Sequence, residues 1–222
     1  NYTDGYNNLA SLGITSGDYD GDGSDEVAVA YYKDKKQSVK IYKLQKQGGG
    51  YTFKQYQEIA QKDYAVKTVS SDRLTDMPQL HLTSGDLNDD IRDELIITAS
   101  YKAHGYSKLS DIVPKTTVWS CTKGNSSLSK KAEYNHAWDY KKYNSEDTSG
   151  KTQFGAYGAA AVGDIDGDEK NELVMACYDV QSDTFGGSSD LYQEKALVSI
   201  AKYSNGSYNE YAGGVGQSID TH

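Results

Sequence analysis

The feature that most constrains the fold of this sequence is an acidic segment that occurs three times, each time between two short apolar runs. The copies span residues 17–26, 85–94 and 163–172. Each copy begins with Gly-Asp and places carboxylate or amide side chains at positions one, three, five and nine, counted from that Asp. Because the copies recur at similar intervals, the sequence predicts a repeat protein of three units.

Four runs of strand-forming residues belong to each unit, and all of them are too short for typical helices. The first two runs of a unit are nearly continuous in apolar character, which is typical of strands buried on both faces. The third run alternates apolar with polar residues and predicts a half-exposed strand, and the fourth run is the most polar. The predicted strands are 12–15, 27–31, 39–44 and 53–59 in the first unit, 80–83, 95–98, 117–121 and 132–138 in the second, and 159–162, 173–177, 197–201 and 208–211 in the third.

Turn-forming residues separate the third and fourth runs of every unit, at 48–50, 123–125 and 204–206, and they predict hairpins. Four antiparallel strands that become more polar from first to last are typical of a β-propeller blade. We therefore expect an all-β fold in one repeat domain spanning 1–222. The expected blades are approximately 8–62, 63–140, and 141–222 with a C-terminal tail.

Only three blades are visible in the sequence, whereas propellers usually have four to eight. The expected architecture is therefore a partial or open propeller. We expect further blades to come from the rest of a longer chain or from another subunit.

Alternating carboxylates in a tight loop suit hard cations such as Ca²⁺, which takes six to eight oxygen ligands. An EF-hand is excluded, because its position twelve must be Glu, and here that position is Val29, Ile97 or Met175. A loop of the form Asp-x-Asp-x-Asp-Gly-x-x-Asp/Glu that opens directly into a strand instead resembles the FG-GAP (VCBS-type) calcium-binding β-propeller repeat. That repeat is known from integrin alpha subunits and from many secreted bacterial and fungal proteins.

The resemblance implies a set of Ca²⁺ ligands in each copy. Position six prefers Gly because the chain turns sharply there, and only Gly23 satisfies this preference. Glu169 takes its place in the third copy and Ile91 in the second, where we expect the loop to deform or to lack metal. We therefore expect two Ca²⁺ sites, in the first and third copies, with the second copy the weakest candidate. The implied ligands are Asp18, Asp20, Asp22, Glu26 and the Ser24 carbonyl in the first copy, Asp86, Asn88, Asp90 and Glu94 in the second, and Asp164, Asp166, Asp168 and Glu172 in the third.

Composition excludes several function classes. The net charge is −9 and the chain contains only two arginines, which argues against nucleic acid as a partner. No apolar stretch approaches the length of a membrane span, so membrane insertion is not expected. The four histidines and two cysteines lack zinc-ligand spacing, and no nucleophile elbow, phosphate loop or dinucleotide fingerprint occurs. We assign no catalytic and no cofactor-binding residue.

Two functions remain open. The first is a secreted protein- or glycan-binding (adhesion) module, whose ligand would contact the long Tyr- and Gly-rich connections at 102–115 and 179–195. The second is a non-catalytic accessory portion of a larger secreted enzyme, such as one that degrades polysaccharides. Glycosylation acceptor patterns at Asn1, Asn125 and Asn205 agree with an extracellular location. Cys121 and Cys177 either pair or remain separate thiols.

Overall fold

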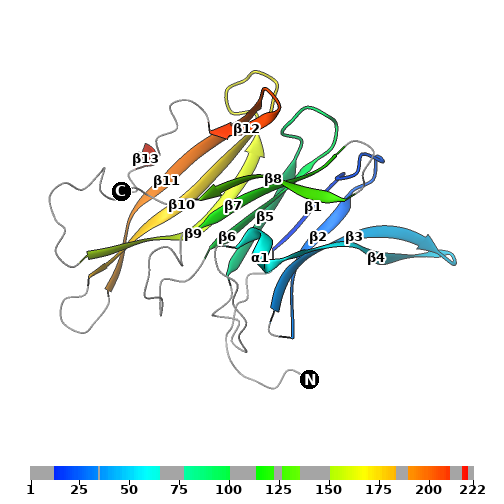
Figure 1. Cartoon of the computed structure of the whole chain (residues 1–222), viewed down its shortest axis with the longest axis horizontal. Coiled ribbons are helices and arrows are strands. Elements are labelled where there is room, and N and C mark those ends of the chain that lie inside the picture. The colour runs from blue at the N-terminus through cyan, green and yellow to red at the C-terminus, as the bar shows by residue number, and fades with distance from the viewer. Residues whose placement is uncertain are drawn as a thin grey trace.

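Three antiparallel sheets make up the computed structural model, which describes residues 13–34, 36–65, 78–100, 114–122, 127–135, 151–183, 190–210 and 217–219. Within each sheet the strands are hydrogen-bonded in the order in which they occur along the chain (Figure 1). The predicted all-β fold with four-stranded antiparallel sheets is confirmed. The first sheet contains β1 (Ile14–Gly17), β2 (Glu26–Lys33), β3 (Lys36–Gln47) and β4 (Gly50–Ala60); the second contains β5 (Gln79–Gly85), β6 (Glu94–Ser100), β7 (Lys115–Cys121) and β8 (Leu128–Asn135); the third contains β9 (Lys151–Gly163), β10 (Glu172–Asp183), β11 (Asp190–Ser204) and β12 (Ser207–Glu210).

Two short elements were not predicted. Strand β13 (Gln217–Ile219) pairs with β11, and α1 (Gln61–Tyr64) is a single helical turn that follows β4. A four-residue helix cannot show helical periodicity in a sequence, which is why no pattern indicated it. Within the described ranges, no helix is long and apolar enough to cross a membrane.

The connection expected at 179–195 is instead mostly strand. Strands β10 and β11 continue to pair as far as Asp183 and Asp190, so the prediction of a long loop was wrong in extent. Backbone pairing rather than an apolar face defines these strand ends, and a hydrophobic pattern therefore gave no signal for them. The connection expected at 102–115 lies outside the described residues except for 114 and 115.

Hairpin turns follow the third strand where they were predicted in the first and third sheets. Gly48 and Gly49 have φ values of 58° and 87°, and Asn205 and Gly206 have values of 52° and 81°. Positive φ at both central residues is the mark of the type I′ turn, which matches the twist of the paired strands. The third expected turn, at 123–125, lies outside the described residues.

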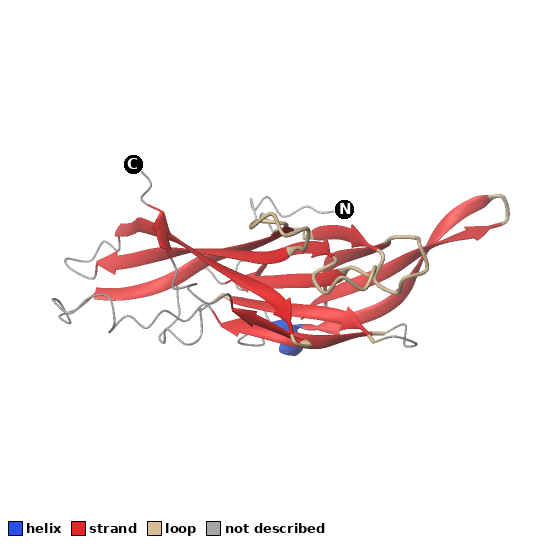
Figure 2. Ribbon diagram, turned by 90° about the horizontal axis from the view of Figure 1, so that it is seen from above, coloured by secondary structure: helices blue, strands red, loops and turns tan. Residues whose placement is uncertain are grey.

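The first strands β1, β5 and β9 lie side by side, so the second sheet lies between the other two (Figures 1 and 2). Adjacent residues of β6 face opposite ways: Ile97 packs in a core shared with the first sheet, and Ile96 packs in a core shared with the third. Strand β7 is also buried throughout, so the predicted half-exposed third strand was wrong in this sheet. The reason is that neighbouring sheets cover the second sheet on both of its faces.

Both cysteines are buried, Cys121 in β7 and Cys177 in β10, and neither forms a disulfide, so the alternative of separate thiols is the one that the structure shows.

Because the third sheet packs closely against the end of β5, Gly85 and the equivalent Gly163 should differ in how well they tolerate a side chain. A Cβ atom added to Gly85 would lie 2.5 Å from Cγ1 of Val162, whereas one added to Gly163 would meet nothing closer than 4.0 Å. We expect Gly85→Ala to lower the free energy of unfolding by about 1–3 kcal/mol through overpacking. Gly163→Ala, the matched control, should stay within about 0.5 kcal/mol. Urea denaturation in dilute solution measures both, and equal losses would contradict this packing.

Candidate metal centres

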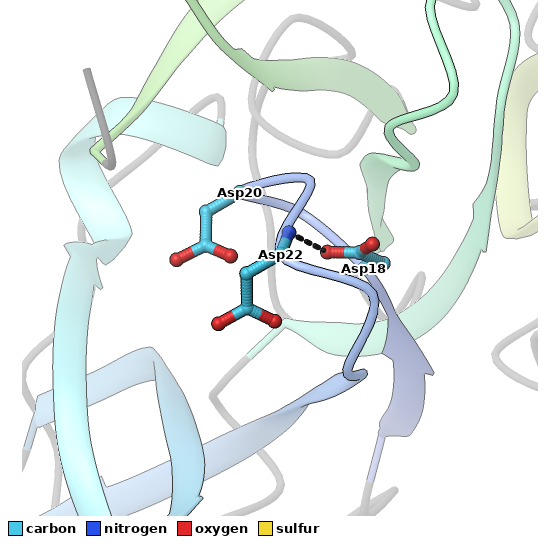
Figure 3. Close-up of side chains that lie close together, drawn as sticks. All are labelled: Asp18, Asp20 and Asp22. Carbon is cyan, nitrogen blue, oxygen red and sulfur yellow. Dashed lines mark hydrogen bonds between the residues drawn. The ribbon is translucent and has the colours of Figure 1, made fainter. Parts of the chain in front are cut away.

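The three acidic segments form loops with one shared backbone arrangement, and we call residues 18–26, 86–94 and 164–172 loop 1, loop 2 and loop 3. In each loop the Asp at position one folds the chain around its carboxylate. Asp18 accepts hydrogen bonds from the amides of Gly21, Asp22 and Gly23 at 2.8, 3.1 and 2.8 Å. Figure 3 shows the bond to Asp22 and the neighbouring carboxylate of Asp20. The amide at position six donates to Oδ2 of the same Asp in loops 2 and 3, from Ile91 to Asp86 at 2.9 Å and from Glu169 to Asp164 at 3.1 Å.

The Glu at position nine closes each loop. It is the first residue of the second strand of its sheet, and it is buried in all three loops. Its Oε2 atom accepts a hydrogen bond from the amide at position two, which leaves Oε1 free to face the interior of the loop. These bonds join Tyr19 to Glu26 at 3.0 Å, Leu87 to Glu94 at 2.8 Å, and Ile165 to Glu172 at 2.9 Å.

Position six has positive φ in every loop, whichever residue stands there. The values are 86° at Gly23, 68° at Ile91 and 67° at Glu169. Of the two outcomes expected for loop 2, deformation at this position is not seen, and the absence of metal stays a prediction. The bond from its amide to Asp86 holds the left-handed conformation, although a β-branched residue is strained there.

A lysine from the third strand of the first sheet contacts three carboxylates of loop 1. Lys43 Nζ lies 2.5 Å from Asp20 Oδ2, 2.8 Å from Asp22 Oδ2 and 3.3 Å from Glu26 Oε1. The carboxylates at positions three, five and nine thus converge on one positive charge.

Loop 3 repeats this arrangement with Lys202 of β11. Its Nζ atom lies 3.1 Å from Asp166 Oδ2, 2.5 Å from Asp168 Oδ2 and 3.2 Å from Glu172 Oε1. The pairing of Val27 with Tyr42 and of Leu173 with Ala201 places each lysine next to the position-nine Glu in the adjoining strand. Neither lysine was predicted from the sequence, although an alignment of the third strands of the three units would have shown a lysine at this position in the first and third.

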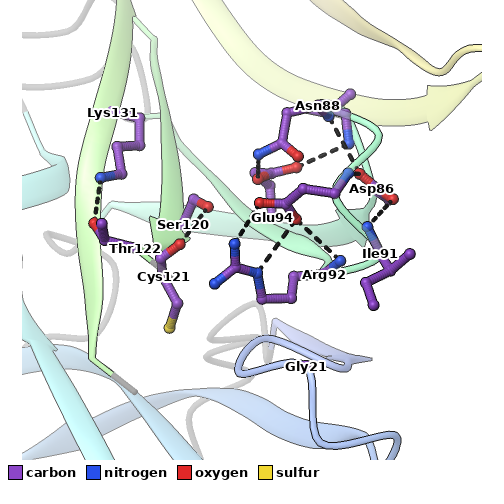
Figure 4. Close-up of polar contacts among 12 residues, drawn as sticks. Gly21, Asp86, Asn88, Ile91, Arg92, Glu94, Ser120, Cys121, Thr122 and Lys131 are labelled. Atoms are coloured by element: carbon purple, nitrogen blue, oxygen red, sulfur yellow. Dashed lines mark hydrogen bonds and ion pairs between the residues drawn. The ribbon is translucent and has the colours of Figure 1, made fainter. Parts of the chain in front are cut away.

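Loop 2 has no such lysine, because the same pairing places Ser120 of β7 next to Glu94. Polar neighbours within the loop act in its place, as Figure 4 shows. Asn88 Nδ2 donates to Glu94 Oε1 at 2.7 Å, and Arg92 binds Asp90 with its Nη2 atom 2.6 Å from Oδ2. The acidic groups of loop 2 are therefore engaged separately rather than gathered around one cation.

Acidic clusters that could hold an ion occur in loops 1 and 3, the two loops that have a central lysine. Single carboxylate oxygens of Asp18, Asp20 and Asp22 lie within 4.8 Å of one another, and so do those of Asp164, Asp166 and Glu172. Loop 2 forms no such cluster among the described residues. The Ser24 amide donates to Asp22 Oδ1 at 3.0 Å, and its carbonyl stays a predicted ligand.

The lysines alter the proton affinities of the groups around them. The hydrogen bond from Lys43 lowers the pKa of Asp22, and the bond from Lys202 lowers that of Asp168. Burial raises the pKa of Glu26, and the nearby charge of Asp20 raises it further. Burial also lowers the pKa of Lys43, but its bonds to Asp20 and Asp22 outweigh this effect, so the lysine stays charged.

In loop 2 no lysine in the described part of the chain balances the charge of the buried position-nine carboxylate, and the pKa of Glu94 is raised instead. Burial raises its pKa from 4.5 to about 7, against the opposing effect of the Leu87 amide. Burial disfavours the charged form of a carboxyl group, so Glu94 binds its proton more tightly than a carboxyl group in water does.

Comparison of the sequence with protein-family models and with curated proteins finds no match. The resemblance to the FG-GAP repeat therefore remains a prediction that rests on the loop motif and its strand context.

The raised pKa of Glu94 predicts a pH dependence of stability. Because the folded state holds this proton more tightly than the unfolded chain does, the associated stability is complete below pH 4.5 and is lost as the pH rises through about 7. Glu94→Gln carries no charge to bury, so we expect the variant to avoid a loss of up to about 3 kcal/mol in the free energy of unfolding.

The substitution suits the site, because Asn88 Oδ1 is buried and accepts no hydrogen bond from the described residues. If the Asn88 side-chain amide rotates by half a turn, this oxygen can accept a hydrogen bond from the amide of the Gln variant. Urea denaturation in chelator across this pH range provides the measurement. Glu58→Gln on the exposed β4 is the control and should follow the parent chain. Parallel curves for the Glu94→Gln variant and the parent chain would contradict the assignment.

Proposed function

We propose that this chain is a calcium-stabilised, secreted β-propeller segment of the FG-GAP type that serves as a protein- or glycan-binding module. The observation that carries the calcium part is the convergence of three loop carboxylates on one cation, in loop 1 and again in loop 3.

One ammonium group cannot balance the charge gathered in either loop. In loop 1 the single positive charge of Lys43 contacts the carboxylates of Asp20, Asp22 and Glu26. An oxygen of Asp18 also lies within 4.8 Å of oxygens of Asp20 and Asp22. Acidic groups packed this closely repel one another unless cations or protons compensate. A divalent ion bound by several of these oxygens would compensate more of the charge, and Ca²⁺ accepts both carboxylate and carbonyl oxygens.

The lysine and the metal would compete for one place. Lys43 Nζ occupies the point on which positions three, five and nine converge, so an ion bound there must displace it. Lys43 lies at the edge of the loop and its side chain is partly exposed, which leaves room for it to move away. Loops 1 and 3 would then alternate between a lysine-bound and a calcium-bound form.

The arrangement of the sheets supports the propeller part of the proposal. Each sheet contains a four-stranded antiparallel meander, and the first strands of the three sheets lie next to one another. Propeller blades place their first strands at the centre in this way.

Ligand binding is proposed from composition alone. The Tyr-rich segment 101–106 lies outside the described residues, and in the segment 185–192 only the backbone of 190–192, in β11, is described. Side chains with an apolar body and a polar tip suit contacts with proteins and glycans.

Calcium should raise the melting temperature of the chain. If free Ca²⁺ exceeds its dissociation constant about a hundredfold, linkage adds about 2.7 kcal/mol of stability. For a chain of this length that corresponds to a rise of roughly 5–10 °C. Differential scanning calorimetry in excess chelator and after Ca²⁺ is restored provides the measurement, and identical melting curves would refute the claim.

The double variant Lys43→Met and Lys202→Met tests whether lysine and metal share one place. Without the competing ammonium, Ca²⁺ should bind at least about tenfold more tightly, because charge-assisted contacts no longer have to be broken. In chelator the same variant should be less stable than the parent chain. Lys46→Met, which changes an exposed lysine of β3, is the matched control and should leave the calcium affinity unchanged.

The binding module is tested by screening protein and glycan ligands and then substituting Tyr101 and Tyr106 with Ser. We expect weaker binding of the detected partner, by about tenfold for a buried tyrosine anchor. Unchanged binding of every detected partner by this variant would refute the role of this segment.

A further inference from the structure

The side chain at position two of each acidic loop reaches the next sheet, except in loop 3. Tyr19 is 0 % exposed in the core shared by the first and second sheets, and Leu87 is 4 % exposed in the core shared by the second and third. Ile165 stands at the same position and its amide makes the same bond to the position-nine Glu, yet it is 56 % exposed. An apolar side chain is thus held in the packing position, and no sheet in the described part of the chain packs against it.

The glycine before each loop shows the same difference. A Cβ atom at Gly17 would lie 2.7 Å from Asp93 Oδ2, and one at Gly85 would lie 2.5 Å from Val162 Cγ1, so the following sheet presses against both. At Gly163 the nearest such atom belongs to Ile165 of its own loop. The outer face of loop 3 is therefore open where the other two loops are covered.

Position eight makes the matching polar contacts to the preceding loop. Asp93 of loop 2 exchanges two hydrogen bonds with the backbone of Asp18, each of 3.0 Å. Asn171 of loop 3 donates to the carbonyl of Asp86 at 2.8 Å. Asp25 holds this position in loop 1, is exposed, and has no hydrogen bond or ion pair with any of the residues that the structure describes.

The first strand of the first sheet is equally uncovered. Leu82 in β5 is 6 % exposed, and the residue equivalent to it in β1, Ile14, is 60 % exposed. Leu82 packs beside Gly13 of the first sheet, which is the contact that Ile14 lacks. The chain therefore carries both halves of its own sheet-to-sheet interface, one half at each end of the array.

We propose that two copies of this chain associate head to tail. The first sheet of one copy would pack on the third sheet of the other. Ile165 would enter the core beside Ile14 of the neighbouring copy, as Tyr19 does beside Leu82 within the chain. Asp25 would accept the amide hydrogen bond of Asp164, as Asp93 does from Asp18. Because Asp25 is the same residue type as Asp93, the polar contact is already encoded in the sequence.

This contact is heterologous, since it joins two different surfaces, and such contacts either close into a ring or extend into an array. It depends on the packing of the sheets and not on bound calcium. Calcium binding is tested by the melting temperature and association of copies is tested by the molar mass, so one can fail while the other holds.

The test is the molar mass of the 222-residue chain in solution, measured by sedimentation velocity as the protein concentration is raised, both in calcium and in chelator. We expect the parent chain to associate. Ile14→Glu and Ile165→Glu each damage one half of the interface and should weaken the association at least about tenfold. Both residues are exposed in the single chain, so both variants should keep the melting temperature of the monomer.

A mixture of the two variants separates a head-to-tail contact from a symmetric one. Each variant keeps the half that the other has lost, so the mixture should form one-to-one dimers and nothing larger. Ile91→Glu is the matched control, because it changes an exposed isoleucine to the residue type that loop 3 carries at the same position, and it should associate like the parent chain. A parent chain that stays monomeric in both buffers, or a mixture that stays monomeric, would overturn the proposal.

Discussion

The structure depends on a buried glutamate that stands at the start of the second strand of every sheet. One oxygen of this carboxylate holds the amide at position two of the acidic loop, and this bond fixes how the chain passes from the first strand to the second. Burying a carboxylate is costly unless it is paired or protonated, so each loop must compensate the charge. Lys43 and Lys202 supply the compensation in loops 1 and 3, whereas Glu94 retains its proton more strongly and accepts a bond from Asn88.

The same loops also connect the sheets. In loops 1 and 2, position two supplies an apolar side chain to the core of the next interface. In loops 2 and 3, position eight binds the backbone of the loop before it. Arg92 adds a further link, because its side chain packs against Gly21 of loop 1, where a Cβ atom would lie 2.8 Å from Cγ (Figure 4). A ligand that orders one loop would therefore stabilise the packing between two sheets, which couples the proposed metal sites to the stability of the array.

Much of the fold could be predicted because the repeat presents each pattern three times. The apolar first and second runs all form strands, and the Asn205-Gly206 turn and the glycine turn at 48–49 follow local rules that the structure obeys. Among the described residues, the predicted burial on both faces holds for β6, whereas β1 and β5 keep exposed residues and the prediction was wrong for them. The extended ribbon of β10 and β11 could not be predicted, since backbone pairing needs no apolar pattern. The burial of β7 also depended on two neighbouring sheets, which no single strand can reveal.

The candidate sites could be predicted only in part. The acidic positions were visible in the sequence, but Lys43 and Lys202 reach them through strand register, which places residues far apart in the chain next to each other. Ile91 adopts a conformation that its residue type disfavours, because the carboxylate of Asp86 and the rest of the loop determine the backbone there. The hydrogen bonds of the whole loop thus outweigh the conformational preference of the single residue Ile91.

The most direct test of the central claim is the number of Ca²⁺ ions bound per chain, measured by isothermal titration calorimetry at neutral pH. We predict two ions, with one lost in Glu26→Gln and the other in Glu172→Gln, because these residues close loops 1 and 3. An absence of binding at millimolar Ca²⁺, or a stoichiometry unchanged by both substitutions, would contradict it.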